Sequence, residues 1–174
     1  MLSSLLAALL VFSVAQVTPA TPPVPRIVER VLAVVDARPV LLSELLVARQ
    51  VRPETDEAGA LEALIDEHLM FAEAIRLPQA ALTEAEEAAA VASIPTPGIA
   101  DADALRRMAR RQATILKYVD FRFRPQVRIT SEDAEERARL EADDLDARIE
   151  AWVKELRAGA RIRYNRVSTG PASR

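Results

Sequence analysis

The stretch that decides the fold runs from Arg26 to Glu44, RIVERVLAVVDARPVLLSE, and its pattern predicts strands where the rest of the chain predicts helices. Residues 31–35 are apolar at every position, so both faces of this short strand need cover from other elements. After a turn over residues 36–39, a second short strand is expected over residues 40–42. The stretch therefore predicts a small hairpin that helices must surround.

The hairpin is expected to continue directly into a helix and to gain a third strand. Ser43 followed by Glu44 is typical of a helix start, in which the serine hydroxyl accepts a free amide hydrogen. Two strands alone are marginal in water, and ARIRYNRV at residues 160–167 is the best candidate for a third. The two ends of the chain are thus predicted to meet in one sheet.

Capping residues and apolar spacing predict five helices, which makes the fold mainly α with a small β-sheet. Prolines at 53, 78 and 125 end three of these segments, since proline and the residue before it disfavour helix. The expected helices run from Ser43 to Gln50, from Thr55 or Asp56 to Pro78, from Thr83 to Ser93, from Asp101 to Pro125, and from Ser131 to Gly159.

Three side-chain patterns on these helices carry further expectations. His68 stands in the apolar stripe of the second helix and is interpreted as a boundary residue. The arginines of the fourth helix, Arg106, Arg107, Arg110 and Arg111, are interpreted as a solvated face balanced by nearby acids. Trp152 lies in the middle of the apolar stripe of the last helix, whose charged first half is expected to project, and it is predicted to pack against the second and fourth helices.

Composition limits both the architecture and the chemistry. A chain of 174 residues that is 50% hydrophobic suits one domain with a proper core. A net charge of -3 argues against nucleic acid as a partner, because neutralising phosphates needs a basic excess. The absence of cysteine excludes disulfides, a thiol nucleophile and thiolate metal ligands. We expect no cofactor and no metal site.

The N-terminus resembles an export signal. Residues 1–15, MLSSLLAALLVFSVA, carry no charge, and small residues follow at a spacing suited to a signal peptidase. We assign residues 1–20 to a signal peptide, 21–25 to a proline-rich linker, 26–167 to the folded domain and 168–174 to a disordered tail. The apolar run is shorter than the roughly 20 residues that span a bilayer. We therefore expect a periplasmic protein that is not stably inserted in a membrane, although a retained anchor is the alternative.

The sequence offers little to an enzyme active site. It has one histidine, no cysteine and only four glycines, none of them in a phosphate-binding arrangement. The acidic residues stand mostly at helix starts or on polar helix faces, where capping and solubility explain them. We expect no catalysis.

Four stretches, in order along the chain, carry a resemblance to a known family. They are RVLAVVDARPVLLSEL, LEALIDEHLMFAEAIRL, ILKYVDFRFRPQVRITSE at residues 115–132, and WVKELRAGARIRY. Together they resemble the SurA family of periplasmic chaperones and peptidyl-prolyl isomerases. The resemblance implies a SurA N-domain-like helical domain in which a C-terminal strand joins the N-terminal hairpin.

The chain departs from this family at two places. Residues 36–39 replace a turn that usually holds Asn or Gly, which tolerate positive φ. Family members also usually carry one or two parvulin domains between the third and fourth stretches, where this chain has only residues 131–144. A parvulin site needs paired histidines, so isomerase activity is not expected.

What remains of the family pattern implies an ATP-independent chaperone, or holdase, that assists protein folding by peptide binding in the periplasm. Its expected partners are unfolded or extended polypeptide clients, above all segments of outer-membrane proteins awaiting assembly. Flexible apolar side chains and stacking arginines suit such binding. The candidate peptide-binding residues are Met70, Phe71, Met108, Phe121, Arg122, Phe123 and Arg124, with core packing as the alternative role for each.

A second interpretation is a non-catalytic structural or assembly subunit that binds one dedicated partner in the envelope. The charged helix half at residues 132–144 would then be the docking surface. A long projecting helix also permits exchange between two copies, so a homodimer is compatible with the sequence.

Overall fold

The computed structural model describes residues 29–94, 98, 101–130 and 132–165. The predicted signal peptide at 1–20, the linker at 21–25 and the tail at 168–174 lie outside the described residues. The described part is mainly helical with one small sheet, which confirms the predicted fold class.

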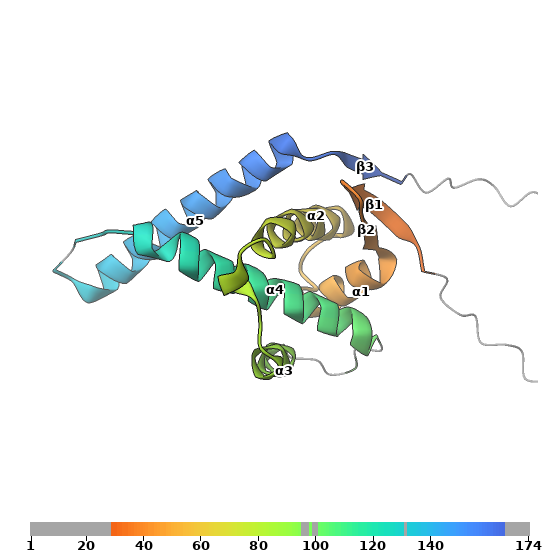
Figure 1. The fold of residues 1–174 in the computed structure, drawn as a ribbon, viewed down its shortest axis with the longest axis horizontal. Helices are drawn as coiled ribbons and strands as arrows, with labels where there is room; N and C mark the ends of the chain where they lie inside the picture. Colours follow the sequence, from red (N-terminus) through yellow and green to blue (C-terminus); the bar gives the residue numbers. More distant parts are fainter. Residues whose placement is uncertain (1–28, 95–97, 99–100, 131, 166–174) are drawn as a thin grey trace, which may run out of the picture.

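The sheet has three antiparallel strands in the order β2-β1-β3. β1 (Val31–Val35) forms the hairpin with β2 (Arg38–Leu41) and pairs on its other side with β3 (Ile162–Tyr164). Asp36 ties the hairpin to the C-terminal strand, since its amide donates to the Arg161 carbonyl and its Oδ1 accepts from the Arg161 amide, both at 2.9 Å. The predicted meeting of the two chain ends is confirmed (Figure 1).

The hairpin turn is shorter than predicted. β2 begins at Arg38, so only Asp36 and Ala37 lie between the strands. Asp36 adopts a φ of 56°, which a short polar side chain tolerates better than a branched one. Pro39 lies within β2, contrary to the prediction, because β2 is an edge strand and can spare an amide donor.

The first helix begins without the predicted serine cap. α1 (Leu42–Val51) has Leu41 at its N-cap, and the Glu44 carboxylate accepts from the Leu41 amide at 3.0 Å. The Ser43 side chain is buried, and its hydroxyl has no hydrogen-bond partner within the part of the chain that the structure describes. Glu44 therefore takes the capping role that the sequence analysis gave to Ser43.

The next elements start with the caps that their sequences predict. Asp56 caps α2 (Glu57–Ala74) through the Gly59 amide, and Thr83 forms a capping box with Glu86 at the start of α3 (Glu84–Ser93). The short 3-10 helix η1 (Pro78–Ala80) connects them. α3 has no buried residue and lies against the outer side of α4 (Figure 1).

α4 (Ala102–Arg122) is the central helix of the molecule and is followed by the 3-10 helix η2 (Arg124–Gln126). It contacts α1, α2 and α3, and Figure 1 shows it running across the molecule beneath α2. Its predicted apolar stripe is largely buried, except that Leu116 is 64% exposed. Lys117 fastens α3 to α4 through Glu86 Oε1 at 2.7 Å.

α5 (Ala134–Gly159) is the longest described helix and lies along the outside of the molecule (Figure 1). Leu145, Ile149, Trp152 and Leu156 pack against the second core cluster, and Trp152 is the one buried residue of α5, so the predicted docking stripe is confirmed. Arg157 forms ion pairs with Glu62 and Asp66 of α2. The chain then returns to the sheet as β3.

The core consists of two clusters. The first lies between the sheet, α1, α2 and the N-terminal half of α4, with Ile65 and Met108 among its most buried side chains. The second lies where the C-terminal half of α4 meets α5 and η1, and is centred on Tyr118 and Trp152. The candidate binding surface is built on this second cluster.

Candidate functional site

Two hollows meet at the C-terminal half of α4, and together they form what we call the aromatic groove. One, of about 430 Å³, lies between the end of α2 and α4 and is lined by Glu73, Arg76, Leu77, Tyr118, Phe121 and Arg122. The other, of about 440 Å³, extends to α5, and its lining includes Phe123, Gln126, Arg148 and Trp152. Glu73, Tyr118 and Arg122 line both hollows, so the two form one continuous surface.

Three aromatic rings make the floor of the aromatic groove rigid. Tyr118 and Trp152 are stacked with ring centroids 4.9 Å apart and an interplanar angle of 16°. Phe123 packs against both, at 5.4 Å from Trp152 and 6.1 Å from Tyr118. Burial raises the pKa of the Tyr118 phenol, Arg122 opposes that rise and Glu73 adds to it. The phenol is therefore neutral at physiological pH.

Four of the sequence-predicted binding residues serve mainly in packing. Met108 is 1% exposed and lies in the first core cluster, so it has no surface to offer a client. Met70, Phe71 and Phe123 are partly buried against the second cluster. Their sequence pattern does not separate these roles, because core and contact residues on an amphipathic helix share the same apolar spacing.

The other predicted residues lie at the surface. Phe121 is 54% exposed and Arg122 is exposed beside it, so both are accessible on the wall of the aromatic groove. Arg124 is exposed and pairs with Asp120 at 2.7 Å. It lines a third hollow of about 570 Å³ between η2 and the first half of α5. The structure thus brings Phe121, Arg122 and Phe123 together and separates them from Met108.

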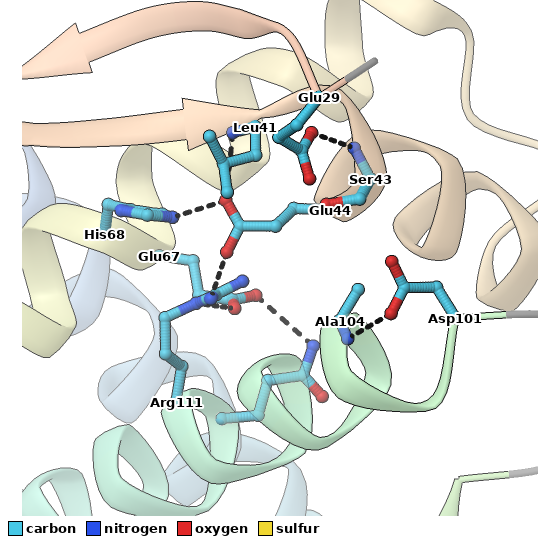
Figure 2. Close-up of polar contacts among 10 residues, drawn as sticks. Glu29, Leu41, Ser43, Glu44, Glu67, His68, Asp101, Ala104 and Arg111 are labelled. Carbon is cyan, nitrogen blue, oxygen red and sulfur yellow. Dashed lines mark hydrogen bonds and ion pairs between the residues drawn. The ribbon is translucent and has the colours of Figure 1, made fainter. Parts of the chain in front are cut away.

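A buried cluster of charged side chains connects α1, α2 and α4 in the interior of the fold (Figure 2). Arg111 donates to Glu44 Oε1 at 2.6 Å and to Glu67 Oε1 at 2.8 Å. His68 Nε2 lies 3.3 Å from Glu44 Oε2, within ion-pair distance but without hydrogen-bond geometry. All four residues are buried, so the cluster connects the three helices in the interior.

The ionic cluster corrects three expectations from the sequence. Arg111 is 5% exposed and does not belong to a solvated arginine face, Glu67 is buried rather than on a polar face, and His68 is inside the fold. Glu44 stands at a helix start as predicted, but its side chain is buried as well. One signal for Arg111 is present in the sequence. It follows Met108 by three residues and precedes Ile115 by four, so it lies on the buried stripe of α4.

The surroundings of Glu44 fix its charge state. Burial by itself raises the pKa of this carboxyl, but His68, Arg111 and the Leu41 amide together outweigh burial and lower the pKa to about 2. Glu44 is therefore ionised at neutral pH, as a partner of a buried arginine must be. This arrangement supports the fold, and within the described residues it adjoins no cluster able to hold a metal ion.

Comparison with known proteins places the chain in no family. No protein-family model matches the sequence, and no curated protein matches it. Among the described residues, no helix is both long and apolar enough to cross a membrane.

Proposed function

We propose that the chain is an ATP-independent periplasmic chaperone of the holdase type, which binds unfolded or extended segments of outer-membrane proteins. The proposal is supported by the resemblance of its four sequence stretches to the SurA family. The single observation that carries it is Phe121, which is 54% exposed on the wall of a groove with a rigid aromatic floor. An exposed ring that lines a hollow together with Tyr118 is the kind of apolar surface that interaction sites use.

The rim of the aromatic groove suits extended polypeptide. Arg122 and Arg76 can donate to the backbone carbonyls of a client or stack on its aromatic side chains, while Glu73 can accept from its amides. Completing the burial of one half-exposed phenylalanine contributes on the order of 1 kcal/mol. Binding of this kind comes from many weak contacts, so it tolerates many client sequences and releases them without nucleotide.

Aggregation of a chemically unfolded outer-membrane protein tests the proposal. The purified protein should suppress light scattering in a dose-dependent manner without ATP, and should do the same for an unrelated unfolded protein. Phe121→Ser should weaken this suppression by several-fold. Leu116→Ser is the matched control, because Leu116 is 64% exposed on the same helix but is not among the residues lining the groove.

Equal activity of the two variants would reject the aromatic groove as the client site. A wild-type protein that suppresses neither aggregation reaction would reject the holdase itself. Circular dichroism of both variants checks that their folds are unchanged.

The third hollow favours one alternative, a subunit that docks on a single envelope partner. The first half of α5 is mostly exposed and, with Arg124 and Val127, encloses about 570 Å³ next to Leu145. Residues 132–144 hold seven acidic side chains against two arginines, which suits one basic partner better than many apolar clients. Charge reversal in this half, tested by the same aggregation assay, separates the two functions, because a holdase should be unaffected.

A further inference from the structure

A separate groove lies along α1, at the other end of α4 from the aromatic groove. It measures about 500 Å³. Its apolar part is formed by Leu46, which is 41% exposed, together with Val47 and Pro53. Its polar part is formed by Glu29, Ser43, Arg49, Gln50 and Asp101. We call this surface the α1 groove.

The α1 groove contains an unused hydrogen-bonding group. Ser43 lines it and is 8% exposed, yet its hydroxyl has no hydrogen-bond partner among the described residues. A buried hydroxyl without a partner costs free energy, so natural folds rarely keep one. Its retention beside an open groove points to a ligand that supplies the missing donor.

Two carboxylates face the same groove, and each has one oxygen to spare. Glu29 accepts from the Ser43 and Arg30 amides through Oε1, and Asp101 accepts from the Ala104 amide through Oδ1 (Figure 2). In the described part of the chain, no bond is found for Glu29 Oε2 or Asp101 Oδ2. Arg49, the one cation among the described residues of the lining, lies 3.6 Å from Glu57. The polar part of the α1 groove therefore offers acceptors at Glu29, Ser43 and Asp101, beside the donors of Arg49 and Gln50.

The positive helix ends nearby do not reverse this polarity. The N-termini of α1 and α4 each carry about half a positive charge, whereas each carboxylate carries a full negative charge. Glu29 and Asp101 therefore place two full negative charges beside an apolar surface, opposed by Arg49, which pairs with Glu57, and by the partial charges of the two helix ends. Oxygen acceptors around an apolar channel suit a primary ammonium group on an aliphatic stem, which is the chemistry of a lysine side chain.

We infer that the α1 groove binds a lysine side chain within an apolar segment of a client polypeptide. The ε-ammonium donates to Ser43 Oγ, Glu29 and Asp101, and neighbouring apolar side chains of the client cover Leu46. This inference rests on the proposed function, since it supplies the holdase with a second and chemically different contact.

A peptide titration followed by NMR tests the α1 groove. The probe is acetyl-Gly-Leu-Leu-Lys-Leu-Leu-Gly-amide added to the ¹⁵N-labelled protein, and its partner is the same peptide with Nε-acetyl-lysine. The lysine peptide should shift the amides around Ser43 and Leu46. The acetylated partner should bind about tenfold more weakly, the factor for losing one hydrogen bond to a charged group.

The matched variant is Glu29→Gln with Asp101→Asn, which removes both charges and keeps the helix caps, because Gln and Asn oxygens still accept amide hydrogens. Its affinity for the lysine peptide should fall about tenfold or more. Ser43→Ala should weaken the same binding and leave stability unchanged or higher, since it removes an unpartnered hydroxyl.

Equal binding of the lysine and acetyl-lysine peptides, or unchanged binding by the double variant, would overturn the lysine site. Equal binding of a lysine-free peptide with a free N-terminus would overturn the choice of a lysine side chain. Phe121→Ser separates the two proposals. If the wild-type protein suppresses aggregation and Phe121→Ser does not, but the lysine peptide causes no shifts in the wild type, only the α1 groove is rejected. If the lysine peptide shifts the amides of the α1 groove but the wild type does not suppress aggregation, only the holdase is rejected.

Discussion

At the scale of single residues, the least expected feature is the arginine inside the fold. Arg111 is 5% exposed and connects Glu44 of α1 with Glu67 of α2. Removing one partner from a buried ion pair leaves an uncompensated charge in the interior, which typically costs about 3–5 kcal/mol. The stability of the three-helix junction therefore depends on this side chain.

Arg111→Met should lower the free energy of unfolding by about 3–5 kcal/mol, because Glu44 and Glu67 stay buried without their cation. Urea denaturation followed by circular dichroism measures the change. Arg110→Met is the matched control. Arg110 is the neighbouring residue, its side chain is 62% exposed, and its ion pair with Glu87 is long, at 3.9 Å. Its effect should stay within about 0.5 kcal/mol. Similar decreases in the free energy of unfolding for the two variants would show that the buried ion pairs contribute no more than an exposed one.

Acid should destabilise the protein through Glu44. Its pKa lies at about 2 in the fold against 4.5 for the free group. A carboxyl whose pKa is lower in the folded than in the unfolded state adds to the free energy of unfolding at pH values above its unfolded-state pKa. This contribution is lost as the pH falls towards the folded-state pKa. The unfolding free energy should therefore decline between about pH 4.5 and pH 2 by about 3 kcal/mol from this group.

Urea titrations across this pH range measure that decline. Glu44→Gln should be less stable at pH 7 and should show a smaller loss between pH 4.5 and pH 2. An unchanged slope in the variant would assign the acid sensitivity to other carboxylates.

The sequence predicts positions of residues better than their partners. Apolar spacing correctly places Trp152 and Ile115 inside, because burial of a stripe follows from helical geometry alone. A charged residue can be buried within this apolar stripe only if another helix places an opposite charge next to it. Glu44 and Glu67 come from positions 67 and 44 residues away from Arg111, and no local pattern specifies that meeting.

At the scale of elements, the hairpin and the closing helix follow from local rules. β-branched residues, caps and prolines define the strands and most helix ends, and the predicted pairing of β1 with β3 is confirmed. The errors occur where tertiary context decides. Pro39 enters β2 because that strand is an edge, and Leu41 caps α1 because Glu44 turns back towards its amide.

The attachment of α5 should depend on its single tryptophan. Trp152→Ala removes the ring that stacks on Tyr118 at 4.9 Å, and large-to-small changes of this kind cost about 3–5 kcal/mol. Urea denaturation measures the loss, and Lys154→Ala on the exposed side of α5 should change stability by less than about 0.5 kcal/mol. Equal stability of the two variants would show that α5 is held by Arg157 and β3 without the aromatic stack.

At the scale of the whole molecule, the two grooves lie at opposite ends of one rigid helix. The 21 residues of α4 extend about 30 Å. An extended polypeptide covers that distance with about nine residues. A long unfolded client can therefore occupy the aromatic groove and the α1 groove at once, which a short loop of a folded protein cannot do. Because only an extended chain can reach both grooves, the protein would bind unfolded chains more tightly than folded ones without requiring a particular sequence.

Tethered peptides test whether the two grooves act together. One peptide joins the lysine heptapeptide to an aromatic segment through about twenty Gly-Ser residues. Another joins the two segments directly, so that the first aromatic residue follows the lysine by about four residues and the pair cannot reach 30 Å. The long peptide should bind about a hundredfold more tightly than either half alone, because the second contact becomes intramolecular. The short peptide should show no such gain, and Phe121→Ser should abolish the gain of the long one. Equal affinities of the two tethered peptides would mean that the grooves bind separate chains, because only a reach-dependent gain requires one client to span α4.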